Sequence, residues 1–506
     1  MAKLSHSNDN SALKTPRAPM HKKKLTILIS VSVTVLLLVA GIVLAIVFWP
    51  DKVDDQDYDM PPRKMQYEYY VDHEDKAGFY LSDNFRAEVP LKEFTKTVIE
   101  SADGLVLGDD LLVKVEDGVE IGAQAVYNFS YKNKVIAVVN VYVIDADAYI
   151  NNATELLAVS ADKTYIVKNA IDLTGVSGNV SRFIGTIHFN HHPVSGFNVE
   201  NGGLFKELDG ATITGLDLTG VSGTLTHTNY GNLGVIANYA NNTRIRYSSV
   251  RGSVSIHSTA SSTEALYVGG MIGYANAVKR KDYTTEEVGY VQLVSYLDLS
   301  VSGSGDLKVG GLIGGVRNAT LGECYAYGKT KLSVDENSVG SLGNIYLGGL
   351  VGVLTKQYDA VTTSYLLDES SQLYSYSDIE IAVNGGGAHN SINVGGIFGL
   401  LQNHSIVNAI YGGDLDVSLT RAPLNIGGII GSTDNSTALK MNVRAVEVKG
   451  EIEIYSLASV NAGGLIGVSV ETQYSNVIAS VMPKISTDTS KKQGTQVAVT
   501  AIASEN

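Results

Sequence analysis

Three histidines stand close together in the sequence, and such a group can supply nitrogen ligands to a metal ion. They are His188, His191 and His192, with Asn190 between them. In a strand–turn–strand setting His191 and His192 point to different faces, because successive side chains alternate. The nearest acidic residues in the sequence, Asp172 and Glu200, lie well outside the group. The pattern therefore predicts a turn of unusual composition rather than a metal site.

Five acidic residues of the second half of the chain alternate with apolar neighbours. They are Asp298, Asp414, Asp416, Glu451 and Glu453. Enzymes that cleave polysaccharides need carboxylates that converge on one groove. Because these five residues belong to different repeats of the sequence, we expect a solvated face rather than an active centre.

Two further candidate catalytic residues lack the neighbours in the sequence that their chemistry requires. His73-Glu74 does not extend to the His-Glu-x-x-His spacing of zinc proteases. Cys324 is the single cysteine, and no histidine lies near it in the sequence to activate it, so we expect a small buried side chain. The sequence thus predicts no catalytic, cofactor-binding or metal-binding residue, no cofactor and no enzymatic activity.

The elements that position these residues come from a repeat. Six blocks of the form Gly-Gly-apolar-apolar-Gly, with starts 32 to 47 residues apart, begin at Gly269, Gly310, Gly348, Gly395, Gly427 and Gly463. Degenerate copies begin at Gly202 and Leu233. This period predicts a solenoid. We expect the glycines to provide positive φ and close backbone approach at corners, the apolar pairs to enter one continuous core, and each rung to take roughly 20 residues.

Segments between the glycine blocks alternate between apolar and polar residues, which is typical of strands with one buried face. They include Ser253–Ile256, Leu297–Val301, Asp414–Leu419 and Glu451–Tyr455. No stretch after residue 150 has convincing helical periodicity. The expected fold class is all-β: a parallel β-helix-like repeat solenoid, preceded by a small β-sandwich-like domain and one N-terminal transmembrane helix.

The region before the repeats has no glycine-pair blocks and a different sequence pattern. Strands are expected at Leu111–Val115, Ala123–Tyr131 and Val135–Ile144, the last two forming a hairpin. Leu91, Phe94 and Val98 recur at helical spacing after Pro90 and predict a short helix. The hairpin is similar to the closing hairpin of bacterial immunoglobulin-like domains, which implies a spacer role.

The N-terminus carries a second strong signal. Residues 25–49 form an apolar run without a charge, longer than the ~20 residues that span a bilayer. Six Lys/Arg and one Asp precede it, so the positive-inside rule places residues 1–24 in the cytoplasm. The run is also longer than the apolar core of a cleaved signal peptide, which is the alternative, and it ends in Trp49-Pro50. We expect an uncleaved signal-anchor, with the bulk of the chain on the extracytoplasmic side of the membrane.

These signals divide the 506-residue chain into six parts. They are a cytoplasmic basic tail (1–24), a transmembrane signal-anchor (25–49), an acidic linker (50–66), a small immunoglobulin-like β domain (67–147), the solenoid (148–480) and a C-terminal tail (481–506). After residue 24 the chain holds 32 Lys/Arg and 51 Asp/Glu, a net charge of −19. This balance argues against nucleic acid or anionic lipid as a main partner.

Two stretches resemble the GLUG-repeat family of surface proteins. The first comprises Leu156–Ser160, Tyr165–Gly175, Phe183–Ile187 and Val194–Phe197, and the second Gly310–Gly314 followed by Cys324–Gly328. The resemblance covers about residues 148–480, although His188-Phe189-Asn190-His191 stands where the family usually has an Asp-Gly-Asn-Gly turn. It implies a right-handed β-helix-like fold on secreted or surface-attached proteins, often regarded as adhesin-like, and it implies no shared active site.

Seven Asn-x-Ser/Thr triplets occur, at Asn128, Asn152, Asn179, Asn241, Asn318, Asn403 and Asn435. In a eukaryotic secretory route they are glycan acceptors, whereas in a bacterium they are accidents of composition. The features together predict a membrane-anchored surface solenoid that acts as an adhesion or scaffold protein through an extended face, with a surface glycan or a protein as ligand. The alternatives are a carbohydrate-active β-helix enzyme and a purely structural surface spacer.

Overall fold

The computed structural model describes most of the chain between Met65 and Thr500. The described residues are 65–75, 78–81, 95–109, 111–131, 134–227, 231–258, 265–277, 289–303, 305–335, 343–356, 369–384, 391–419, 423–436, 440–456, 459–470, 472–480, 482–486 and 497–500. The expected tail 1–24 and anchor 25–49 lie outside them, as does the linker 50–66 except for its last two residues. Within the described ranges, no helix combines the length and the hydropathy that a membrane span requires.

The first described body is a small domain of two sheets. One sheet has the order β1 (Met65–Asp72), β7 (Lys134–Ile144), β6 (Gln124–Tyr131) and β3 (Thr95–Ser101). The other has the order β2 (Phe79–Tyr80), β5 (Leu112–Val115) and β4 (Leu105–Leu107). β6 and β7 form the predicted antiparallel hairpin, and β1 pairs with β7 in parallel. Side chains of both sheets, such as Tyr69, Val113 and Val141, share one buried cluster, as expected of a β-sandwich-like domain.

The helix expected after Pro90 is wrong at Val98. This residue lies in β3, which pairs with β6, and its side chain is 55% exposed. Thr95, Thr97, Val98 and Ile99 are β-branched residues, which favour a strand, and pairing with β6 outweighs three apolar residues at helical spacing. Leu91 and Phe94 lie outside the described residues.

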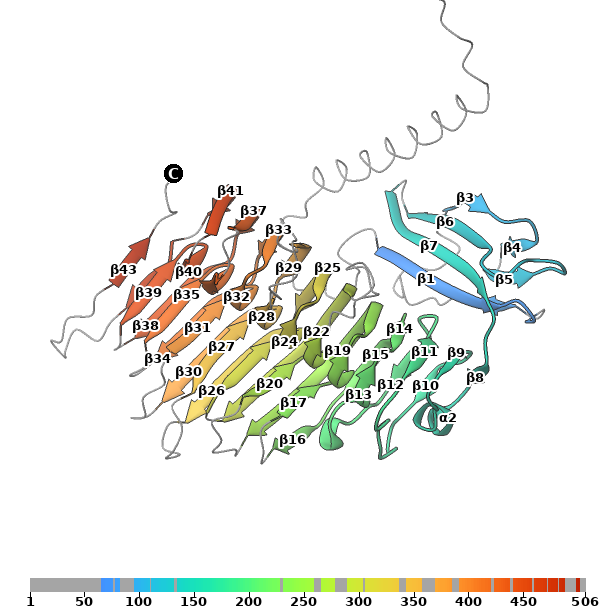
Figure 1. The fold of residues 1–506 in the computed structure, drawn as a ribbon, viewed down its shortest axis with the longest axis horizontal. Coiled ribbons are helices and arrows are strands. Elements are labelled where there is room, and N and C mark those ends of the chain that lie inside the picture. Colours follow the sequence, from blue (N-terminus) through green and yellow to red (C-terminus); the bar gives the residue numbers. More distant parts are fainter. Residues whose placement is uncertain are drawn as a thin grey trace, which may run out of the picture. The chain divides into compact units, whose positions relative to one another are not determined.

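Beyond Asp147 the chain forms a stack of parallel strands (Figure 1). In the described residues it comprises three sheets, which we call A, B and C. Sheet A contains β8 (Ala148–Ile150), β9 (Lys163–Val167), β10 (Ile171–Asp172), β11 (Gly185–His188), β12 (Pro193–Ser195), β14 (Thr212–Thr214), β15 (Asp217–Val221), β16 (Thr224–His227), β19 (Arg244–Ser258), β22 (Gly289–Gly303), β25 (Thr320–Tyr327), β26 (Lys329–Asp335), β29 (Glu369–Ser375), β30 (Asp378–Asn384), β33 (Ser405–Tyr411), β34 (Leu415–Leu419), β37 (Met441–Val448), β38 (Ile452–Ser456), β41 (Thr472–Ala479) and β42 (Lys484–Ser486).

The other two sheets contain one strand per turn of the chain. Sheet B contains β13 (Phe205–Asp209), β18 (Ala237–Asn241), β21 (Ile272–Asn276), β24 (Ile313–Arg317), β28 (Val351–Thr355), β32 (Phe398–Gln402), β36 (Ile430–Asp434) and β40 (Ile466–Val468). Sheet C contains β17 (Gly231–Gly234), β20 (Leu266–Gly269), β23 (Leu307–Gly310), β27 (Asn344–Gly348), β31 (Ser391–Gly395), β35 (Leu424–Gly427), β39 (Val460–Gly463) and β43 (Val497–Thr500). The predicted β-solenoid is therefore the fold that the structure has.

One rung of the stack takes one whole repeat. From β23 the chain passes through a glycine block to β24, continues through β25 and β26 of sheet A, and returns to sheet C as β27. β27 pairs with β23, so that Gly348 lies beside Gly310, 38 residues earlier in the sequence. The expected rung of roughly 20 residues fits the first turns, where Gly185 lies beside Lys163, 22 residues earlier, but it is wrong for the glycine-block repeats. The alternating segments form only one side of each rung, and the glycine blocks with their flanking strands form the return.

The block glycines are needed because backbones approach closely, not because of their φ angles. A Cβ added to Gly310 would lie under 3.0 Å from the Ile313 carbonyl of its own block, and one added to Gly311 would meet the Gly349 carbonyl of the next rung equally closely. At Gly314 it would meet the Val268 amide of the preceding rung. The described glycines of the six full blocks keep φ outside the left-handed region, so the expectation of positive φ is wrong for them, whereas Gly202 of a degenerate copy has a φ of 95°. Both apolar residues of the blocks are buried, as predicted.

Left-handed backbone occurs at other corners, on residues that are not glycine. Between sheets B and A, Asn242, Asn318 and Asn403 have φ of 48°, 61° and 54°. Asparagine tolerates this region better than most residues. The side chain of Asn403 is buried and donates to the Lys356 carbonyl (3.1 Å), so this glycosylation triplet has a structural role in the folded chain. A second series, with φ of 51–57°, bends sheet A at Tyr247, Gln292, Glu323, Gln372, Asn408, Ala445 and Asn476.

Both ends of the stack differ from the expectation. The short helix α2 (Ala153–Leu157) and the 3₁₀ turn η3 (Val199–Asn201) were not expected, because neither is long enough to show a period. Asn152 caps α2 by accepting the Glu155 amide proton, and Leu156 joins the solenoid core. At the other end β42 and β43 pair with β38 and β39, so the segment expected as a tail (481–506) contains two strands of the stack.

Two side-chain amides of the solenoid hold the edge of β1. Asn190 accepts the backbone N–H of Tyr70 (2.8 Å) and donates to its carbonyl (2.8 Å). Gln292 does the same for Gln66, at 3.2 Å and 2.9 Å. Each amide therefore supplies the donor and the acceptor that a neighbouring strand would supply.

Candidate binding face

The histidine turn is confirmed, and its rings have separate partners. Asn190 and His191 have positive φ, of 52° and 56°. His188 Nδ1 lies 2.8 Å from the Thr214 hydroxyl, and His191 Nδ1 lies 2.9 Å from Asp217 Oδ2. Burial lowers the pKa of His188 to about 3, which favours its neutral form. Sequence reasoning missed Asp217 because it reaches His191 from the next turn of the chain, 26 residues away.

Cys324 is buried as predicted. Its thiol is within hydrogen-bonding distance of the Tyr290 carbonyl (3.7 Å) and the Gly322 carbonyl (3.5 Å). Burial raises the pKa of the thiol to about 12, so the nucleophilic thiolate is suppressed near neutral pH.

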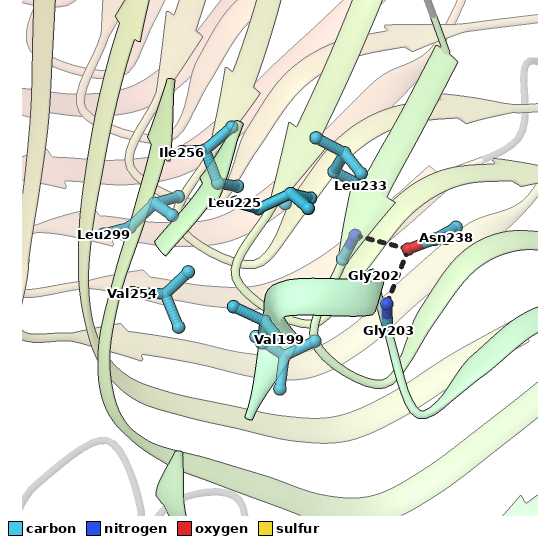
Figure 2. A pocket seen from close by; sticks show the side chains of 12 residues that line it. Val199, Gly202, Gly203, Leu225, Leu233, Asn238, Val254, Ile256 and Leu299 are labelled. Atoms are coloured by element: carbon cyan, nitrogen blue, oxygen red, sulfur yellow. Dashed lines mark hydrogen bonds between the residues drawn. The ribbon is translucent and has the colours of Figure 1, made fainter. Parts of the chain in front are cut away.

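One small cavity lies in the described interior of the solenoid. This cavity, of about 10 Å³, lies among apolar side chains that include Val199, Leu225 and Leu233 (Figure 2). Beside it the side-chain oxygen Oδ1 of Asn238 accepts the backbone amide protons of Gly203 (2.9 Å) and Gly234 (3.4 Å). The volume suffices for about one water molecule. This cavity is too small for a ligand, and the groups that could bind one lie on the outer surface.

The acidic residues of different repeats stand side by side on the outside of sheet A. Strand pairing places Glu380 next to Asp416, and Asp416 next to Glu453. Two residues earlier, the Asp414 amide donates to Asp378 (3.1 Å) and the Glu451 amide donates to Asp414 (2.9 Å). We call these residues the acidic strip: Asp378, Glu380, Asp414, Asp416, Glu451 and Glu453.

The acidic strip corrects one argument from the sequence. Membership of different repeats was expected to keep the carboxylates apart, but residues one repeat apart are neighbours when strands stack about 4.8 Å from one another. The solvated face itself is confirmed, because Asp414, Asp416 and Glu453 are exposed while Leu415 and Val417 between them are buried.

Lysines neutralise the two ends of the acidic strip. Glu380 lies 2.6 Å from Lys329 Nζ and 2.7 Å from Lys331 Nζ, and these hydrogen bonds lower the pKa of its carboxyl group. At the other end Lys484 lies 2.6 Å from Glu451 and 3.3 Å from Glu453, which raises the pKa of the lysine. The centre of the strip, at Asp414 and Asp416, has carboxylates in both neighbouring rungs.

A column of stacked tyrosines lies in the rungs that precede the strip and shares one rung with it, at Tyr376 and Asp378. The Tyr327 ring lies 5.0 Å from the Tyr296 ring and 5.3 Å from the Tyr376 ring, with interplanar angles of 12° and 11°. The Arg251 guanidinium lies 4.6 Å from the centre of the Tyr296 ring. We call Tyr296, Tyr327 and Tyr376 the tyrosine column. Tyr296 precedes Asp298 by two residues in β22, so strand alternation places these two side chains on the same face.

This face offers binding groups at a regular spacing but encloses nothing. Its carboxylates accept hydrogen bonds and its lysines donate them. The half-buried Tyr296 and Tyr376 add aromatic surface, whereas Tyr327 between them is buried. The open strip does not exclude water from a bound molecule. The arrangement therefore suits the binding of an extended ligand across several rungs. The sequence signal for the column was a tyrosine two residues before an acidic residue, as at Tyr296 and Tyr376. Only the rung length shows which of these residues stack on one another.

Comparisons with known proteins do not identify a family. No family model matches the chain, and no curated protein matches it. One solved structure, from Bacteroides ovatus and described as a "putative immunoglobulin A1 protease", aligns over 70% of this chain and 84% of its own, with 14% sequence identity and a TM-score of 0.36. A likeness of this size carries no inference about this chain. The resemblance to GLUG-repeat proteins accordingly stays a prediction from the sequence.

Proposed function

We propose that this protein is a surface-displayed β-solenoid that binds an extended ligand along the outer face of sheet A, as an adhesion or scaffold protein. The observation that supports this role is that the acidic strip continues in register over three successive rungs. A row of carboxylates repeated over several rungs suits a repeating ligand, such as a surface glycan, or the extended chain of a protein.

The charge of the face narrows the ligand chemistry. Asp414 and Asp416 have carboxylates on both sides, so an anionic polymer would meet repulsion at the centre of the strip. A neutral or cationic polymer with hydrogen-bond donors fits better. Sugar hydroxyl groups can donate to carboxylates, and their apolar ring faces suit tyrosines.

The membrane part of the proposal rests on the sequence. Residues 25–49 would anchor the chain and hold the solenoid on the extracytoplasmic side. The resemblance to GLUG-repeat proteins supports such a surface location. A chain anchored in this way would present the same face repeatedly to ligands outside the membrane.

A glycan array tests the binding role with the full chain in detergent micelles. The double variant Asp414→Asn/Asp416→Asn should lose binding to neutral or cationic glycans, because it removes the central carboxylates. The variant Asp103→Asn, an exposed residue of the small domain, should keep it. Unchanged binding by the double variant, or no binding by the original chain, would overturn the proposal; the latter result would favour a structural spacer.

The same preparation tests a second candidate, a carbohydrate-active enzyme. The observation that favours it is the closeness of Asp414, Asp416 and their neighbours in adjacent rungs, since hydrolysis of glycosides uses paired carboxylates. Assays of reducing-sugar release on the bound glycans should be negative. Release that the double variant abolishes would establish the enzyme instead.

A further inference from the structure

One group of metal-ligating side chains lies outside the binding face. Asp72 and His73 follow one another at the end of β1, and Asp145 comes directly after the end of β7. β1 and β7 are parallel neighbours, with Asp72 beside Ile144, and the His73 amide donates to the Ile144 carbonyl (2.9 Å). The pairing therefore brings two segments 72 residues apart to one point.

The distances within this group suit a small divalent cation. His73 Nδ1 lies 3.2 Å from Asp72 Oδ1 and 3.9 Å from Asp145 Oδ1, and the three ligand atoms all lie within 4.8 Å of one another. Bonds of 2.0–2.2 Å to a tetrahedral Zn²⁺ place ligand atoms about 3.3–3.6 Å apart. The first distance is close to the lower end of this range. The Asp145 side chain is 72% exposed, so it is free to make the remaining approach.

The imidazole nitrogen of His73 supplies a second, independent observation. Nδ1 is buried and makes no hydrogen bond in the structure, although two carboxylate oxygens lie within 4 Å of it. Its in-plane direction is thus aligned with neither oxygen. A cation between the three atoms would satisfy the nitrogen and both carboxylates together.

Neighbouring residues hold the buried carboxylate in place. Asp72 Oδ1 accepts the Glu74 amide proton (3.0 Å), and Oδ2 accepts the Tyr149 hydroxyl proton (2.7 Å) from β8 of the solenoid. Such outer contacts fix the orientation of metal ligands. Lys168, the lysine of this corner, forms an ion pair with Asp75 and lies 4.6 Å from the Tyr149 ring centre. The charge of Lys168 therefore interacts with Asp75 and Tyr149, not with Asp72, His73 or Asp145.

We propose that Asp72, His73 and Asp145 form a site for a divalent metal ion, with Zn²⁺ as the ion that the ligand set fits best. One imidazole and two carboxylates provide three protein ligands, and the exposed side at Asp145 leaves the fourth position to water. Because Tyr149 of β8 holds Asp72, the ion would tie the ends of β1 and β7 to the start of the solenoid. The proposal replaces the expectation of no metal site and does not depend on the function of the outer face.

Metal titration of the chelator-treated full chain tests the site. We expect one Zn²⁺ per chain by calorimetry and a higher melting temperature, because an ion that binds only the folded state stabilises it. Co²⁺ should give the visible absorption of a tetrahedral site. His73→Ala and Asp145→Asn should each abolish both signals, and because Asp145 is exposed, its variant should fold normally.

Matched variants separate this site from other zinc-binding groups. His257→Ala and Asp103→Asn change an exposed histidine and an exposed aspartate elsewhere, and they should keep the binding. Binding that survives His73→Ala and Asp145→Asn would overturn the proposal, as would a chain that binds no Zn²⁺. The latter result would mean that His73 serves as an ion-pair partner of the carboxylates. Preference for Ca²⁺ with no Zn²⁺ binding would also overturn it.

Discussion

The repeated glycines and the repeated asparagines of this chain have different structural roles. Gly311 leaves out a Cβ where the carbonyl of Gly349 in the next rung approaches closely, without any unusual φ. Asn318 and Asn403 instead adopt left-handed backbone at a corner. The two residue types are both typical of turns, yet only the corner needs conformational tolerance.

This distinction predicts opposite results for two glycines near one another. Gly311→Ala should lower the free energy of unfolding by about 1–3 kcal/mol, because the added Cβ would collide with the backbone of the next rung. Gly322→Ala is the control, since its Cβ would meet nothing within 4 Å and its φ is not left-handed. It should be neutral or slightly stabilising, by up to about 1 kcal/mol. Urea denaturation measures both, and equal losses would contradict the assigned role of the block.

Sequence could predict which residues point inward, but not what touches them. The alternation at Leu297–Val301 gives the buried and exposed positions correctly, because that pattern is local. The partner of His191 is Asp217, and the partner of His73 is Asp145; both contacts depend on which strands become neighbours. Without the register between strands, these pairs carried no sequence signal.

At the scale of strands, the parallel register turns a sequence repeat into a spatial row. Asp416 of β34 pairs with Glu380 of β30 and with Glu453 of β38, so three carboxylates follow one another across the sheet. Like charges directly opposite one another destabilise paired strands. Such a row therefore costs stability, which is understandable if the face serves binding.

Removing the central charge should stabilise the sheet. Asp416→Asn should raise the free energy of unfolding by up to about 0.5 kcal/mol, because two like-charge contacts disappear, which the lysines beside Glu380 and Glu453 already weaken. The gain should shrink in high salt, which screens exposed charges. Ser300→Asn is the control in the same column, where Lys331 is the next neighbour, and it should have little effect at any salt concentration. Loss of stability in Asp416→Asn, measured by urea denaturation at two salt concentrations, would contradict a repulsive row.

Strand positions were predictable wherever the alternation was long enough. The expected segments Val135–Ile144 and Glu451–Tyr455 lie within one residue of β7 and β38. The five-residue helix α2 escaped notice because a single turn has no period to detect. Val98 was misassigned because pairing with β6, which lies far along the chain, decided its conformation.

At the scale of the molecule, the repeat is the unit that stacks. The glycine block of each repeat contacts the block before and the block after it, and the strands of sheets B and C pair in strict chain order. Stability of such an array is approximately a sum over rungs and the interfaces between neighbouring rungs. Its length should therefore be adjustable by whole repeats and by nothing smaller.

Deleting residues 311–348 tests this unit directly. The deletion removes 38 residues and joins Gly310 to Gly349, two positions of the same block, because Gly310 pairs with Gly348. β23 would then lead into β28 in the register that β27 has now, so the shortened chain should fold and unfold cooperatively, with the loss of one interface between rungs. Deleting residues 311–329 is the control. It joins β23 of sheet C to β26 of sheet A and should abolish cooperative unfolding, which circular dichroism during thermal denaturation measures. If a rung took only half a repeat, the shorter deletion would remove one whole rung and should fold better than the longer one. Better folding after the shorter deletion would therefore show that a rung is not one whole repeat.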